Sequence, residues 1–460
     1  MAYSRENQQR WQSKLVLFVA AWGLVLVGGE FCSADERPGE VLTAKDTAAA
    51  IDQLVVNAWK EAGATPADLA SDAEYLRRVS LDVAGRIPSV AEIREFLADQ
   101  TPDKRQRVVE ELLDRPAYVR NMTTILRNSL IPQANSNAQF RGLIPGFEAW
   151  LWERISAGTA YDQIAREIIT TPIGAANPGG PVLTTASSPE AFFLVRELKP
   201  ENLTTGTARA FLGVRIDCAQ CHDHPFDNWK QKQFWSLAAF YSGFAAPEAA
   251  EDAVLVMRER TDVREITIPA TGEVVPAVFL DGETPQWTDA ATEESRSRRL
   301  LAEWVTAPEN PYFARMAVNR LWGQFFGRGL VHPIDDFSES NPPSHPEVLD
   351  LLASQFALHH YDLRFLVRAI TATRVYQSSS VITKVGPQDE ELFTRAALRG
   401  LTPEQFFDSL AEAVGYYQPY RTDNPFVLDT DSPRSRFLEL FRNESESPLH
   451  HETTILQALA

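Results

Sequence analysis

Residues 201–241 read ENLTTGTARAFLGVRIDCAQCHDHPFDNWKQKQFWSLAAFY. Residues 201–212 repeat apolar side chains at helical spacing, and Gly213 is a typical residue at the end of a helix. Asp227 or Asn228 can cap a second helix that runs from Trp229 to Tyr241. The stretch therefore predicts two helices joined by a short loop, and this loop concentrates two cysteines and two histidines.

The loop contains Cys218-x-x-Cys221-His222, which is the attachment sequence of c-type haem. Two thiols three residues apart lie on one side of a helical turn and can both add to the haem vinyl groups. The imidazole that follows can then reach the iron as its proximal ligand. This pattern predicts haem c held by Cys218 and Cys221, with His222 on the iron.

The same loop also has the spacing of a metal site without haem. Cys218, Cys221, His224 and Asp227 recur at every third position, and His222 could replace His224. Thiolate, imidazole and carboxylate ligands in such a run suit tetrahedral zinc or another transition metal. A simple disulfide between the two cysteines is the third interpretation. The residues alone leave the three alternatives open.

Composition limits the class of protein and its partners. The chain has 460 residues, of which 44% are hydrophobic and 23% charged, so it can bury a large core. The formal net charge is −18, which argues against a general nucleic-acid binder, because such a protein needs a basic face to neutralise phosphates. It also argues against adhesion to anionic membranes.

The first 34 residues have the pattern of an export signal. Arg5, Arg10 and Lys14 precede a short apolar run, and Cys32 and Ala34 offer small residues for cleavage before position 35. We expect a periplasmic or extracellular protein with no stable membrane insertion after cleavage. An uncleaved membrane anchor is the alternative, although the apolar run is shorter than the roughly 20 residues that span a bilayer.

The rest of the chain favours a mainly α, multi-helical protein of two domains. Apolar residues recur at helical spacing in most segments, for example over residues 44–59 and 90–98. β-like runs on both sides of Thr271-Gly272 predict a small hairpin. The expected organisation is a signal at 1–34, a Cys/His-bearing helical domain at 35–245, a linker with the hairpin at 246–290 and a second helical domain at 291–460.

Five stretches resemble a known family. They are Asp82–Pro88, residues 211–235, Asn319–Gly327, Val331–Phe337 and Asn341–Pro346. Together they are similar to large secreted planctomycete proteins that pair a planctomycete cytochrome-type domain with a planctomycete secreted domain, both of unknown function. The resemblance covers nearly the whole chain after the signal.

The resemblance implies a site and a context. The first domain of the family is named for its Cys-x-x-Cys-His, matched here by Cys218, Cys221 and His222, and haem is inferred from that motif. Members are often encoded beside exported sulfatase-like proteins, which suggests such a partner and a link to polysaccharide breakdown. Similar proteins usually continue beyond Ala460, so we expect a C-terminus that is truncated or divergent.

A second set of candidates lies in the irregular segment 327–343 and just after it. His332, Asp335, Asp336, Glu339 and His345 combine carboxylates and imidazoles on a proline-rich loop. Such groups can bind a cation or act as general acid and base. Each one taken alone is more simply a solvated or capping residue. We expect the loop as a whole to be the better candidate, because irregular segments on a helical frame often carry function.

Two functions follow from these patterns. The first is an exported c-type haem protein for redox chemistry or electron transfer, with a redox partner. The alternative is a metal-dependent enzyme or a binding protein that acts on an extracellular polysaccharide. Whether the protein is an enzyme is left open by the sequence.

Overall fold

The computed structural model describes residues 40–173, 187–244, 259–260, 263–287, 296–381, 390–417, 432–442 and 449. The expected export signal and much of the expected linker lie outside these residues. Within the described part of the chain, no helix combines the length and the apolar character needed to cross a membrane.

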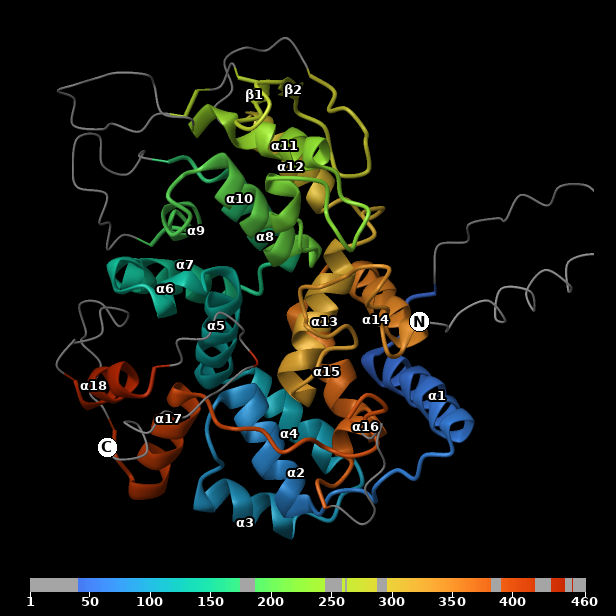
Figure 1. Cartoon of the computed structure of the whole chain (residues 1–460). Helices are drawn as coiled ribbons and strands as arrows, with labels where there is room; N and C mark the ends of the chain where they lie inside the picture. The colour runs from blue at the N-terminus through green and yellow to red at the C-terminus, as the bar shows by residue number, and fades with distance from the viewer. Residues whose placement is uncertain are drawn as a thin grey trace, which may run out of the picture. The chain divides into compact units, whose positions relative to one another are not determined.

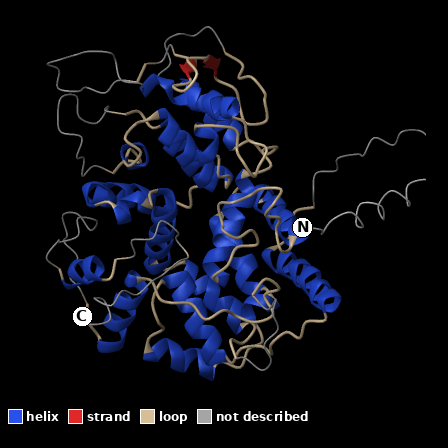
Figure 2. Cartoon of the chain, in the orientation of Figure 1, coloured by secondary structure: helices blue, strands red, loops and turns tan. Residues whose placement is uncertain are grey.

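Helices dominate the described residues, which confirms the mainly α prediction (Figures 1 and 2). The helices before the hairpin are α1 (Ala44–Ala62), α2 (Asp72–Val79), α3 (Val90–Ala98), α4 (Lys104–Leu113), α5 (Pro116–Leu130), α6 (Gln133–Ser136), α7 (Ile144–Ser156), α8 (Tyr161–Thr170), α9 (Ala191–Leu194), α10 (Pro200–Thr207) and α11 (Gln231–Ala238). Those after it are α12 (Arg296–Val305), α13 (Phe313–Phe326), α14 (Pro346–Leu358), α15 (Leu363–Ala372), α16 (Arg374–Gln377), α17 (Pro403–Val414) and α18 (Pro433–Leu440).

Short turns of tighter or wider helix extend several of these elements. π-helical turns follow α2 at Ser80–Ala84 and α10 at Ala208–Leu212, and 3₁₀ turns occupy Ala138–Leu143, Asp217–Gln220 and Ala239–Phe244.

The hairpin predicted around Thr271-Gly272 is also present. Strands β1 (Glu265–Thr267) and β2 (Val274–Pro276) pair antiparallel, with Ile266 opposite Val275. Gly272 adopts a φ of 73°, which a residue without Cβ reaches at no steric cost. Val275 is fully buried, so the hairpin is attached to the helical body through this side chain.

Helix α1 shows how local sequence sets the elements. The Thr43 hydroxyl accepts a hydrogen bond from the Asp46 N–H at 3.2 Å, which satisfies an N-terminal donor. Gly63 ends the helix in the left-handed conformation. Between these caps the buried side chains Ile51, Val55 and Trp59 form one face, as their spacing predicts.

Helices from both halves of the chain share one hydrophobic core. Helix α1 packs against α14 and α15, which come from the last third of the chain (Figure 1). Helix α13 packs against the π turn Ala208–Leu212, and α8 packs against α12. The Trp59 indole N–H donates to the Leu392 carbonyl at 2.7 Å, a contact that spans most of the sequence. The segment that leads into the Cys/His turn therefore packs against a helix that comes from the part of the chain after the hairpin.

Two consecutive polar residues of α13 explain part of the stretch Asn319–Gly327. Asn319 is fully buried, and its amide donates to the carbonyls of Val331 and Ile334 and accepts from the Val331 N–H. The Arg320 guanidinium donates to the Ala210 carbonyl at 2.7 Å. Asn319 thus fixes the loop that follows α13, and Arg320 links α13 to the helical turn before the Cys/His turn.

Candidate functional site

The Cys/His motif forms a short helical turn at the surface. Residues Asp217–Gln220 make one turn of 3₁₀ helix, and the Cys221 N–H donates to the Cys218 carbonyl at 3.4 Å. Ala219 is fully buried and anchors the turn in the core. Cys218 and Cys221 are both exposed, and both thiols are free. The turn therefore presents to solvent two thiols that form no disulfide.

Helix α11 holds this turn from the other side. The Gln231 side-chain amide donates to the Cys221 carbonyl at 2.7 Å, and the Trp235 indole N–H donates to the Gln220 carbonyl at 2.9 Å. Trp235 is 4% exposed, so its ring is fixed by packing as well. Carbonyls that the short turn leaves unpaired are thus satisfied by the next helix.

The N-terminus of α11 corrects one local prediction. The helix begins at Gln231, and neither Asp227 nor Asn228 caps it. Instead, Asp223 Oδ1 accepts a hydrogen bond from the Gln231 N–H at 3.0 Å. This bond, together with the nearby Lys230 ammonium, holds the pKa of Asp223 below its ordinary value. The cap therefore comes from within the Cys/His motif, and it fixes the residue that follows His222.

The two histidines of the motif have opposite hydrogen-bond roles. His222 Nδ1 lies 2.7 Å from the carbonyl oxygen of Asp223, and a carbonyl can only accept, so Nδ1 carries the proton. In the neutral ring, Nε2 then keeps a lone pair for a metal. His224 Nδ1 accepts from the Phe226 N–H at 3.3 Å, so the neutral ring carries its proton on Nε2. In these neutral tautomers, the Nε2 lone pair is present on His222 and absent on His224.

Asp227 is engaged locally and lies near the second half of the chain. Its Oδ1 accepts from the Asn228 N–H at 2.8 Å. Burial first, and the Asp227 charge second, raise the pKa of Tyr312, which directly precedes α13. Across the described residues, which include the whole motif, no three side chains of His, Cys, Asp or Glu are grouped to hold a metal ion. The predicted set with Asp227 is therefore not assembled as a ligand cluster in this structure.

The second set of candidates is divided between two environments. His332 has an exposed side chain whose ring is still partly shielded from water. This shielding, followed by the charges of Arg328 and Arg215, lowers the pKa of His332. His345 is only 5% exposed; its ring packs against Phe393, and burial lowers its pKa. His345 therefore belongs to the core rather than to an open site.

The carboxylates of this loop have structural partners. Asp335 accepts from Arg209 at 2.8 Å and from Arg215 at 2.6 Å. Asp336 is half-buried and its backbone carbonyl accepts from the Asn341 amide at 2.9 Å, whereas Glu339 is exposed. Of these residues, Asp335 has the contacts that bear on the Cys/His motif, because Arg215 precedes Cys218 by three residues.

A backbone contact strengthens this link. The Phe337 N–H donates to the Gly213 carbonyl at 2.8 Å. Gly213 has a φ of 70°, and a Cβ there would lie 2.6 Å from the Phe337 ring, so only glycine fits. The sequence identified Gly213 as a helix end but gave no signal for its contact with Phe337. The loop from 332 to 337 therefore packs on the segment that leads into the Cys/His turn.

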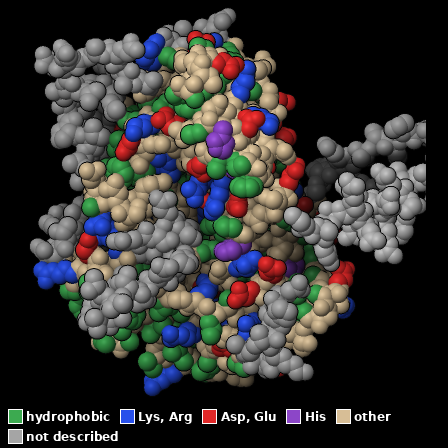
Figure 3. Space-filling model, in the orientation of Figure 1, with side chains coloured by type: hydrophobic (Ala, Val, Ile, Leu, Met, Phe, Trp, Pro, Cys, Tyr) green, Lys and Arg blue, Asp and Glu red, His purple; other side chains and the backbone are tan. Residues whose placement is uncertain are grey.

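Arginine side chains reach the surface at the Asp335 contact, although the whole chain is acidic. On the face drawn in Figure 3, Lys and Arg side chains gather near the middle, with histidines above and below them. Arg209 and Arg215 have side chains 37% and 38% exposed, and they share the single carboxylate of Asp335.

Comparison with known families now places these elements. Residues 50–246 match the PSCyt2 model, described as "Protein of unknown function (DUF1549)", and residues 297–453 match the PSD1 model, described as "Protein of unknown function (DUF1553)". The chain carries a PSCyt2 domain followed by a PSD1 domain. No curated protein and no solved structure matches the chain.

The contacts at the Cys/His turn join two different domains. The Cys/His turn, Arg209 and Arg215 all belong to the PSCyt2 domain, whereas His332, Asp335 and Phe337 belong to the PSD1 domain. The ion pairs of Asp335 and the hydrogen bond of Phe337 therefore join the two domains just ahead of Cys218.

Proposed function

We propose that the protein is an exported c-type haem protein with a redox or electron-transfer role, and that Cys218, Cys221 and His222 form its attachment site. One observation carries the proposal. Two free, exposed thiols lie on a single helical turn, and the histidine that follows keeps its Nε2 lone pair because Nδ1 donates to the Asp223 carbonyl. This is the donor set and tautomer that proximal ligation requires.

The chain's own residues supply the chemistry of attachment. Cys218 and Cys221 would hold the group covalently, because each thiol would add across one vinyl C=C bond, with the new S–C bond on one carbon and the thiol hydrogen on the other. The step would consume no oxidant, and it would need both thiols free of a disulfide, as they are in this structure. When bound, the haem supplies one-electron redox chemistry.

Several neighbours fit this group. Ala219 in the core and the two α11 side chains, Gln231 and Trp235, hold the turn so that its exposed residues keep a fixed position. Phe226 is 84% exposed in the same loop and offers apolar surface to a macrocycle.

The test is to produce the full chain, with its export signal, in a bacterial host that has a c-type maturation system. We expect a Soret-absorbing protein whose haem stain survives denaturing electrophoresis. Replacing both thiols, in Cys218→Ser/Cys221→Ser, should abolish the covalent stain, whereas Asp227→Asn should keep it.

Metal analysis on the same sample distinguishes the two alternatives to haem, a bound metal ion and a disulfide. A colourless protein with one bound equivalent of zinc, copper or iron would overturn haem attachment and favour a metal-dependent enzyme or binding protein, with an extracellular polysaccharide as the substrate to examine. A colourless and metal-free protein would leave a dithiol that can close to a disulfide. If haem is attached, pull-down with the haem-loaded protein should identify its redox partner or an exported sulfatase-like protein.

A further inference from the structure

A separate cavity of about 250 Å³ lies between α2, α13, α16 and the residues before α17. It is smaller than the roughly 300–1,000 Å³ of pockets that take drug-sized ligands, so it suits a compact molecule. Its lining comes from both domains, with Asp82 and Arg77 from PSCyt2 and Phe325 and Arg399 from PSD1. It contains none of the Cys/His motif.

The polar groups deep in this cavity are already paired with one another. Asp82 has a side chain 3% exposed, and it accepts from the Tyr376 hydroxyl at 2.7 Å and from Arg399 at 2.5 Å. Glu74 accepts from Arg78 at 2.6 Å and from the Ser380 N–H at 2.7 Å. A ligand with many polar groups would find few free partners here, and it would leave its own groups unsatisfied.

Apolar side chains complete the lining. Phe325 and Phe326 are 3% and 5% exposed, and Leu81 and Ala396 also face the cavity. Leu398, which is 83% exposed, lies at the same site. An exposed leucine beside a partly apolar cavity indicates room for an apolar ring.

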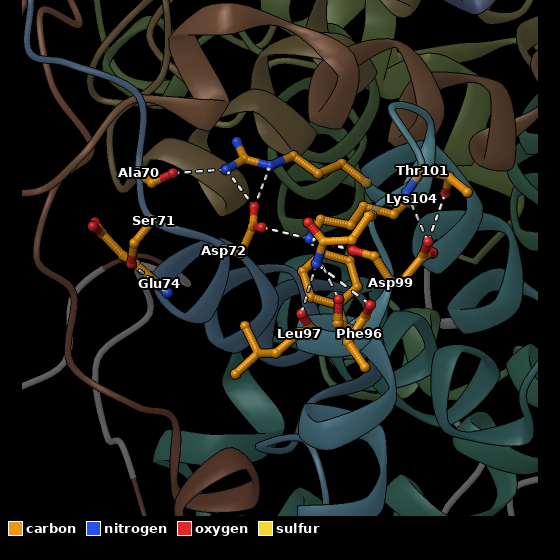
Figure 4. Close-up of polar contacts among 12 residues, drawn as sticks. Ala70, Ser71, Asp72, Glu74, Phe96, Leu97, Asp99, Thr101 and Lys104 are labelled. Atoms are coloured by element: carbon orange, nitrogen blue, oxygen red, sulfur yellow. Dashed lines mark hydrogen bonds and ion pairs between the residues drawn. The ribbon is translucent and has the colours of Figure 1, made fainter.

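Arg77 differs from the paired polar groups of the cavity. It lines the cavity and is exposed, and it makes no ion pair or hydrogen bond to any residue that the structure describes. Its helix is firmly held, since Ser71 caps α2 and Asp72 pairs with Lys104 at 2.5 Å and Arg105 at 2.9 Å (Figure 4). Arg77 is therefore a cation on a well-fixed helix, and its guanidinium has no partner among the described residues.

We propose that this cavity binds a small amphipathic monoanion, with an apolar ring against Phe325 and Phe326 and a carboxylate or sulfate on Arg77. Three arginines and two carboxylates line the site, Arg77, Arg78 and Arg399 against Glu74 and Asp82, and this balance favours one negative charge. A planar guanidinium binds either anion through two parallel hydrogen bonds. The proposal is independent of haem at the Cys/His turn.

The test uses ligand-observed NMR on the full chain with benzoate and phenyl sulfate as probes and benzyl alcohol as the neutral control. We expect at least one anion to bind, and benzyl alcohol to bind at least threefold more weakly. Arg77→Gln should weaken binding of the anion by about twofold to fivefold, as expected for an exposed ion pair. Comparing the two anions decides between the carboxylate and the sulfate.

Two further variants keep the outcome interpretable. Arg94→Gln removes an exposed arginine of α3 that does not line the cavity, and it should leave binding unchanged. Ala397→Trp should fill the cavity from its exposed side and abolish binding. The proposal fails if neither anion binds at millimolar concentration, if benzyl alcohol binds equally well, if both arginine variants behave alike, or if binding survives Ala397→Trp in a folded protein.

Discussion

Asp335 of the PSD1 domain accepts a hydrogen bond from Arg215 of the PSCyt2 domain at 2.6 Å, three residues before Cys218. The same carboxylate accepts from Arg209 at 2.8 Å. The two domains thus meet through a charged contact at the entrance of the Cys/His turn. This contact gives the PSD1 loop a positioning role, since its residues hold the backbone that carries the thiols.

Asp335→Asn should lower the free energy of unfolding by about 2 kcal/mol, because two partly buried guanidinium groups lose their charged acceptor. Urea denaturation of the full chain measures the change. The matched control is Asp350→Asn, which breaks the surface pair with Arg315, where the side chains are 43% and 53% exposed. The control should cost less than about 1 kcal/mol. Equal losses in the two variants would contradict the role of Asp335.

The stability difference should also depend on pH. Burial alone would raise the pKa of Asp335, but Arg209 and Arg215 outweigh it and hold the pKa below its ordinary value. The ion pairs therefore contribute fully above the unfolded pKa of about 3.9, and their contribution is lost as the pH falls through the lower folded value. Wild type should exceed Asp335→Asn most at neutral pH, and the gap should shrink below about pH 4. A gap that stays constant down to acid unfolding would argue against this titration.

Gln231→Ala should loosen the Cys/His turn without unfolding the chain. The variant removes the 2.7 Å hydrogen bond to the Cys221 carbonyl, worth about 1 kcal/mol. Amide hydrogen exchange over residues 217–223 should accelerate roughly fivefold, the equivalent of that energy. Lys232→Ala, which removes only an exposed pair with Glu273, is the control and should leave exchange in the turn unchanged.

Asn319→Ala should be among the more destabilising substitutions in the PSD1 domain. Asn319 is fully buried, and its loss leaves the Val331 N–H and the carbonyls of Val331 and Ile334 without partners. We expect a loss of about 3 kcal/mol in the free energy of unfolding, measured by urea denaturation. Asn57→Ala, whose side chain accepts only from Gln53 at the surface, should change it by less than about 0.5 kcal/mol.

If haem is attached, the two motif histidines should differ in the absorption spectrum. His222→Ala removes the ring whose Nε2 is free, so the covalent stain should persist while the spectrum changes to that of an iron without its proximal imidazole. His224→Ala should leave the spectrum close to wild type, because the His224 Nδ1 accepts from Phe226 and its Nε2 holds the proton. The reverse pattern would assign the ligand to His224.

Much of the helical architecture was readable from local sequence. Residues 44–59 and 90–98 predict α1 and α3, and Thr402-Pro403 predicts the start of α17, whose Thr402 hydroxyl caps the helix. These features depend on spacing and capping within a few residues, so the sequence carries them directly. The two-stranded hairpin has the same origin in its Thr271-Gly272 turn.

Two helix caps predicted from the sequence are absent, because another group binds the capping side chain or the helix N-terminus. Ser344 and Glu347 have the spacing of a capping box, yet α14 begins at Pro346 without a side-chain cap, and the Ser344 hydroxyl lies 3.2 Å from His345 Nδ1 instead. At α11, Asp223 displaced the expected cap because the Cys/His turn folds back onto that helix. The sequence shows which residues can cap a helix, but only the tertiary structure shows which of them lies close enough to the helix N-terminus to do so.

The sequence by itself determined the helices, the hairpin and the Cys218–His222 motif, because each depends on residues close together in the chain. Only the tertiary structure decided that Asp335 holds Arg215, that His345 belongs to the core, and that Arg77 and Phe325 line one cavity. Those pairings join residues far apart in sequence. They follow from how the helices of the two domains pack into one core, and no local pattern records that packing.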